Sequence, residues 1–242
     1  EEFEDKRDQQ RNLARSSWSG SGDSKTEKIW FELNAKLNPT EFLGYSVNET
    51  ESAVISIISN GKECKTLKSS ESGTLILNQT VFYAESGGQI GDQGKIFGHD
   101  FTFQVNDTKK KGNLILHIGT ITEGKINKND QVKCHINEER RNNCRSYHSA
   151  THILHQALRD ELGGHVVQKG SLVSHDKLRF DFSHHLAMSQ NEINAVEFKI
   201  NKVINKATDV STKLMSPEDA IKEGALALFG EKYTDEERVV SI

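Results

Sequence analysis

Several features are scarce or missing in this 242-residue sequence, and each absence removes a class of protein. No apolar run approaches the roughly 20 residues of a membrane-spanning helix, and the N-terminus is charged, so we expect neither a membrane span nor a signal peptide. Three cysteines, Cys64, Cys134 and Cys144, are too few and too scattered for a disulfide framework, which points to a reducing cytoplasm. The formal net charge of −4 argues against a surface that is cationic all over. The first residue is not Met, so we expect a piece excised from a longer chain.

What is present fits a globular protein with more than one core. Apolar residues make up 34% and charged residues 27%, and the length allows two cored units. Two local basic clusters could contact phosphate: Lys109 to Lys111 in an expected turn, and Arg140, Arg141 and Arg145 beside a helix. Either cluster could equally be a solvated face.

The order of patterns predicts an α+β chain in three parts. Residues 1–37 form a helical lead-in, which ends where Asn38 precedes Pro39. Residues 38–137 form a small antiparallel β-barrel, because short alternating runs are separated by Gly, Asn and Asp. The expected strands are Ser52 to Ser59, Thr74 to Asn78, Val81 to Ala84, Phe101 to Val105, Leu114 to Ile118 and Gln131 to Ile136, with a hairpin loop at Asn106 to Asn113.

Residues 138–242 mix helices with strands, which predicts a two-layer α/β sandwich. The first helix should stop at Gly163, and Ser189 with Glu192 forms the capping box of a second. A third helix should begin after Ser216. The expected strands are Val166 to Gln168, Leu178 to Phe182, Val210 to Met215 and Arg238 to Ile242.

The strongest chemical signal is a pair of histidines four residues apart, His148 and His152. At this spacing two imidazoles share one helix face and can reach one cation, usually zinc. Ser149 occupies the position at which a metalloprotease has its Glu base, so a protease is not expected. Cys144 extends the row by one turn, but three successive turns present ligands to one ion poorly. Both histidines could also be ordinary helix residues.

Other polar residues have ordinary structural interpretations. Arg179 and Asp181 alternate on one strand face and should form an ion pair, and His155 should pack against the sheet. His184 and His185 look like loop residues, and Gln168 could be a surface glutamine. The glycines from Gly87 to Gly94 could serve only as turns. No serine has the context of a nucleophile elbow.

Four stretches together carry a family resemblance. They are Arg145-Ser-Tyr-His-Ser-Ala-Thr-His-Ile-Leu-His155, Leu162-Gly-Gly-His-Val-Val-Gln-Lys-Gly-Ser171, Lys177-Leu-Arg-Phe-Asp-Phe-Ser-His184 and Thr80-Val-Phe-Tyr-Ala-Glu-Ser-Gly-Gly-Gln-Ile-Gly-Asp-Gln-Gly94. With Thr80 to Gly94 upstream of the other three, they resemble the editing domain of alanyl-tRNA synthetase. The segment Asp8 to Arg15 also resembles the last helix of that synthetase's aminoacylation half.

The resemblance implies a zinc-dependent hydrolase that clears Ser or Gly from mischarged alanine tRNA. It assigns zinc to His148 and His152 and to a Cys-x-x-x-His pair beyond Ile242, so residues 1–242 should hold half of the metal site. It places Thr80 and Gln89 near the amino-acid side chain and Gln168 where its amide could orient substrate or water, which makes these three the candidate catalytic residues.

The implied partners are the acceptor end of tRNA(Ala) and the rest of the synthetase chain, and the oligomeric state is open. Three alternatives remain. The first is a tRNA-binding module without catalysis, and the second is a free-standing editing protein. The third is a threonyl-type editing domain, against which the expected barrel and its Gly-Gly-Gln motif argue.

Overall fold

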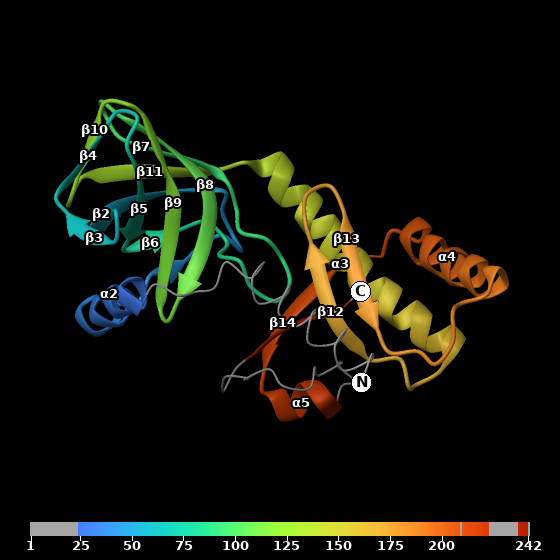
Figure 1. The fold of residues 1–242 in the computed structure, drawn as a ribbon. Coiled ribbons are helices and arrows are strands. Elements are labelled where there is room, and N and C mark those ends of the chain that lie inside the picture. Colours follow the sequence, from blue (N-terminus) through green and yellow to red (C-terminus); the bar gives the residue numbers. More distant parts are fainter. Residues whose placement is uncertain (1–23, 209, 223–236, 242) are drawn as a thin grey trace, which may run out of the picture. The chain divides into compact units, whose positions relative to one another are not determined.

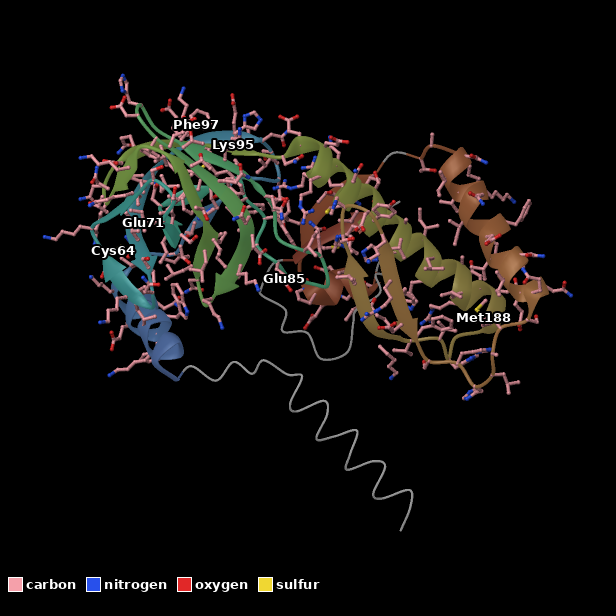
Figure 2. All side chains as sticks on the ribbon, turned by 45° about the horizontal axis from the view of Figure 1, so that its top comes forward. Cys64, Glu71, Glu85, Lys95, Phe97 and Met188 are labelled. Atoms are coloured by element: carbon pink, nitrogen blue, oxygen red, sulfur yellow. The ribbon has the colours of Figure 1, made fainter. Side chains whose placement is uncertain are left out.

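The structure, a computed structural model, describes residues 24–208, 210–222 and 237–241. It is of the α+β class and divides into two compact units (Figure 1). The first unit comprises the described residues up to Ala84 together with Gln93–Ile136. The second unit combines the short segment Glu85–Asp92 with the described residues after Ile136. Glu85, labelled in Figure 2, is the residue at which the chain passes to the second unit.

The first unit is built on a closed antiparallel barrel of six strands. In spatial order the strands are β11 (Gln131–Ile136), β7 (Gly94–Phe97), β8 (Thr102–Lys111), β9 (Leu114–Glu123), β5 (Ser72–Leu77) and β2 (Glu49–Ser59). Pairing of β11 with β2, in which Gln131 lies opposite Ala53, closes the barrel. Closure removes the free sheet edges, which agrees with the barrel expected from the sequence.

Short strands and a helix complete this unit. β3 (Lys62–Cys64) pairs antiparallel with the end of β2, and β4 (Thr66–Lys68) pairs with β10 (Lys125–Asn127). β1 (Glu41–Phe42) runs parallel to β6 (Gln79–Thr80). Helix α2 (Ser24–Lys36) lies against the barrel (Figure 1), where Leu33 joins Leu116 in a small apolar cluster.

The barrel core follows from the alternation of its strands. In β11 the side chains of Val132, Cys134 and Ile136 are buried while those between them are exposed. They join a cluster that includes Phe82 and Phe103, both without exposed surface. Cys134 is a core residue without exposed surface, and this burial raises the pKa of its thiol to about 12.

Several of the predicted boundaries in this unit are wrong, and two of the differences have a clear physical reason. The expected loop Asn106 to Asn113 is mostly strand, because β8 continues to Lys111 and only Gly112 and Asn113 make the turn. The three lysines are held in the strand by pairing with β9, which outweighs their low strand propensity. The expected strand Val81 to Ala84 is buried but irregular, since burial of apolar side chains does not require ladder pairing.

The second unit centres on α3 (Glu138–Leu162). A hairpin of β12 (Gln168–Val173) and β13 (Leu178–Phe182) lies against it, as does α4 (Gln190–Asn205) (Figure 1). Ala157, Leu158, Val166 and Val196 form the core of this packing, and Met188, labelled in Figure 2, packs on its edge. β14 (Ser211–Met215) pairs with β15 (Glu237–Ser241), and α5 (Pro217–Lys222) follows β14.

Local signals in this unit are confirmed at several points. Ser189 and Glu192 form the capping box of α4, and Ser216 caps α5 through the backbone N–H of Asp219 at 3.2 Å. The strand expected from Val166 begins instead at Gln168, because Val166 follows a turn and is buried in the helical core. The described strands of the second unit form two separate two-stranded sheets, β12 with β13 and β14 with β15. The two-layer sandwich therefore stays a prediction. Within the described residues, the helices are too short or too polar to cross a membrane.

Candidate functional site

The site is built on the long helix of the second unit. Asn137 caps the N-terminus of α3 by accepting a hydrogen bond from the backbone N–H of Arg140, and two glutamates occupy the first turn. Gly163 ends the helix at φ 111°, and its N–H donates to the carbonyl of Arg159. The caps fix both ends of the helix. The two histidines lie well inside it, where residue spacing determines which face a side chain occupies.

His148 and His152 lie side by side on one face of α3. Their ring centroids are 5.1 Å apart and their planes differ by 22°. His148 is half-buried, whereas His152 is exposed to solvent on one side. Partial burial nevertheless lowers the pKa of His152, which favours the neutral imidazole that metals bind.

Gln89 brings the glycine-rich segment to this pair. Its side-chain oxygen lies 2.7 Å from Nδ1 of His148, and Gln89 itself is buried. A carboxamide oxygen only accepts hydrogen bonds, so Nδ1 of His148 carries the proton. In the neutral ring this leaves the lone pair on Nε2. The structure thus brings the glycine-rich segment into contact with the histidine helix, whereas the roles assigned to these residues stay predictions.

The backbone of the segment Glu85–Asp92 is fastened to the hairpin beside α3. The N–H of Val173 donates to the carbonyl of Gly88 at 2.7 Å, and the N–H of Ile90 donates to the carbonyl of Val173 at 3.1 Å. Gly88 has φ +80°, and a Cβ there would lie 2.7 Å from the carbonyl oxygen of Ser171. A side chain at this position would push the segment away from β12.

A second side-chain contact joins the segment to α3. The guanidinium of Arg141 donates from Nε to both carboxylate oxygens of Asp92, at 3.1 and 2.9 Å, and also from Nη2. Both side chains are almost fully buried, at 4% and 3% exposure. In the basic cluster that could contact phosphate or be a solvated face, Arg141 is thus paired with Asp92 and Arg140 donates to His175.

The other two candidate catalytic residues lie elsewhere. Gln168 is half-buried at the start of β12, in the same unit as the histidines. Thr80 belongs to the first unit and has no exposed surface. Its hydroxyl donates to Nε2 of His117 at 2.8 Å and accepts from the N–H of Phe82 at 3.1 Å, while Nδ1 of His117 donates to the carbonyl of Leu75. The site roles of Thr80 and Gln168 stay predictions.

Three structural interpretations made from sequence are confirmed. Arg179 and Asp181 form an exposed ion pair at 3.2 Å. His155 is buried with its ring 5.1 Å from that of Phe180, and burial lowers its pKa. His184 lies in a loop, as does His185.

In the part of the chain that the structure describes, the candidate metal ligands amount to one ring nitrogen each from His148 and His152. Across residues 24–208, 210–222 and 237–241, no group of three or more His, Cys, Asp or Glu side chains is arranged to hold a metal ion. Cys144 lies on the same helix and is buried, and burial raises the pKa of its thiol. It does not join the two histidines in such a group.

Comparison with known proteins places the chain in a family. The model of the family described as tRNA synthetases class II (A) matches residues 1–140, more than half of the chain. The chain belongs to this family. It is also 49% identical over 241 residues to an alanine–tRNA ligase of Rhodopseudomonas palustris and 47% identical over 241 residues to that of Nitrobacter winogradskyi. Each alignment covers 99% of this chain, and the chain spans 27% of each relative.

In this class II (A) synthetase chain, the family match ends inside the first turn of α3, before the histidines. The histidine helix and the hairpin are covered by the alignments with the two ligases. Sequence reasoning missed one part of the site, the pairing of Asp92 with Arg141. Asp92 lies within the glycine-rich motif Thr80 to Gly94, and a carboxylate between Gly91 and Gly94 was the available signal.

Proposed function

We propose that this chain is part of an alanine–tRNA ligase and that its second unit hydrolyses the ester of Ser or Gly wrongly attached to tRNA(Ala), at a zinc-dependent site. The observation that carries the proposal is the contact of Gln89 with His148, beside His152, in a chain similar to two alanine–tRNA ligases. The acceptor end of tRNA(Ala) is the proposed partner, together with the rest of the ligase.

The two histidines fit a zinc ion in their chemistry and spacing. Neutral imidazole nitrogens are ordinary zinc ligands, and the two rings lie 5.1 Å apart on one helix face. A metal-bound histidine usually donates its other ring N–H to a fixed acceptor, which is the position of Gln89. His148 and His152 would hold the ion, and the remaining ligands lie outside this pair.

Zinc bound there would supply a polarised ester carbonyl or a more acidic water. The chain's own residues do the positioning. Gln89 holds the ring of His148 in one orientation and one tautomer, and the β12–β13 hairpin packs against α3, the helix that carries both histidines. Gln168, half-buried at the start of β12, is proposed to orient the substrate or the attacking water through its amide.

The test is a deacylation assay with purified Ser-tRNA(Ala), Gly-tRNA(Ala) and Ala-tRNA(Ala). The full-length protein encoded by the gene should release Ser and Gly and spare Ala. His148→Ala and His152→Ala should each abolish release, while alanine activation stays unchanged. His185→Gln, in an exposed loop of the same unit, is the matched control and should behave like the unchanged protein.

The outcome also separates the proposal from its main alternative. A double variant at His148 and His152 that still clears Ser-tRNA(Ala) at the original rate would rule out hydrolysis at this pair. A protein that binds tRNA(Ala) but releases neither Ser nor Gly would instead be a tRNA-binding module.

A further inference from the structure

The segment Glu85–Asp92 touches α3 through two side chains, and their spacing on the two elements matches. Arg141 and His148 are seven residues apart, which is two helical turns and about 10.5 Å along the axis. Asp92 and Gln89 are three residues apart, and three residues reach at most about 10–11 Å when extended. With Asp92 on Arg141 and Gln89 on His148, the segment is held to α3 at two points that lie two helical turns apart.

The ion pair of Asp92 with Arg141 is chemically suited to anchor the segment on α3. A guanidinium and a carboxylate joined through two nitrogens and two oxygens fix direction as well as distance. Both groups are almost fully buried, so water does not compete for them. Stability alone explains such a pair poorly, because buried ion pairs replaced by apolar residues of similar size often leave stability unchanged or improve it.

We propose that the ion pair of Asp92 with Arg141 is a positioning device that sets Gln89 on Nδ1 of His148 and so fixes the tautomer of that histidine. Asp92 and Arg141 act through Gln89 and are positioning residues. The catalytic consequence rests on the proposed editing function, whereas the effect on the His148 ring does not.

The decisive variant replaces both charges at once, Asp92→Leu with Arg141→Met, so that neither charge is left buried without a partner. The readout is nitrogen-15 NMR of the histidine rings in the metal-free 242-residue chain, above the pH at which histidines protonate. The His148 signals are identified by their loss in His148→Gln. In the unchanged chain, His148 should show a protonated Nδ1 and an unprotonated Nε2, and in the double variant this pattern should be lost.

Two further variants keep the test decisive. Glu161→Gln with Lys199→Met removes an ion pair of 2.7 Å that joins α3 to α4, and it should leave the His148 pattern unchanged. Arg141→Lys keeps the charge and loses the two-pronged contact, and it should give a mixture of tautomers even if the double variant fails to fold. In the full-length protein, the Asp92 and Arg141 changes should lower kcat/KM for Ser-tRNA(Ala) roughly 10- to 100-fold, as is typical of residues that orient a metal ligand.

The positioning proposal is overturned if a folded double variant, or Arg141→Lys where the double variant does not fold, keeps the His148 pattern of the unchanged chain. An unchanged protein that releases no Ser, while its His148 pattern still depends on Asp92 and Arg141, would overturn the editing function and leave the positioning role standing.

Discussion

His148 donates its Nδ1 proton to the side-chain oxygen of Gln89 over 2.7 Å, although 59 residues separate them in the chain. The contact joins a helix to an irregular glycine-rich segment that is itself tied to β12 by backbone hydrogen bonds. Its consequence is chemical, because the tautomer of a histidine determines which ring nitrogen can bind a metal.

Replacing Gln89 with Leu should therefore impair hydrolysis without unfolding the second unit. Leu fills a similar volume but accepts no hydrogen bond, so His148 loses its fixed orientation. We expect kcat/KM for Ser-tRNA(Ala) to fall roughly 10- to 100-fold. The measurement is single-turnover deacylation by the full-length protein. Gln156→Leu, which removes an exposed glutamine on α3, is the control, and equal rates for both variants would contradict the role of Gln89.

Two adjacent glycines offer a matched pair. Gly87 and Gly88 both have positive φ, so an alanine at either costs about 1 kcal/mol or more in backbone strain. Only at Gly88 would the new Cβ clash with backbone, 2.7 Å from the carbonyl oxygen of Ser171. Gly88→Ala should lower the melting temperature and the deacylation rate more than Gly87→Ala does. Equal losses in both assays would show that close packing at Gly88 is unimportant.

His117 should make the barrel unit sensitive to mild acid. Complete burial lowers its pKa from 6.5 to about 4, so the unfolded chain takes up a proton first as the pH falls. The stability contributed by the neutral ring is present above pH 6.5 and is lost progressively between pH 6.5 and about 4. The slope is about 1.4 kcal/mol per pH unit, or about 2 kcal/mol between pH 6.5 and 5.

The check is urea unfolding of the chain at several pH values, with His117→Gln as the comparison. The variant loses stability at pH 7, because Thr80 and Leu75 lose a well-placed partner. It should lack the extra slope between pH 6.5 and 5, and the difference between the two proteins removes the effect of other titrating groups. Parallel pH curves would show that His117 does not remain neutral in the folded protein.

The 242-residue chain should bind zinc weakly. Two imidazoles supply half of a tetrahedral set, and in the described residues no third His, Cys, Asp or Glu joins them. Metal analysis after dialysis should find less than one zinc per molecule of the 242-residue chain. A chain extended through the expected Cys-x-x-x-His should retain one tightly bound zinc per molecule. His152→Ala should abolish binding in the longer chain. Tightly held, stoichiometric zinc in the shorter chain would contradict this prediction and make Cys144 or another histidine a ligand.

Local patterns in the sequence were enough for the elements that local chemistry specifies. The helix carrying His148 and His152, its end at Gly163 and the capping box at Ser189 were all expected, because caps and helical spacing depend on neighbouring residues. The barrel was also expected, since β-strands that alternate between buried and exposed residues need a closed or covered sheet. Strand ends were less predictable where composition and pairing disagree, as in the lysine-rich end of β8.

The sequence by itself determined which residues could act at the site, and only the tertiary structure decided which of them meet. Two histidines four residues apart share a helix face whatever surrounds them. The partners of that face come from distant parts of the chain: Gln89 on His148 and Asp92 on Arg141, brought there by packing of an irregular segment. Such contacts depend on how elements pack, and the spacing of residues along the chain carries no record of it.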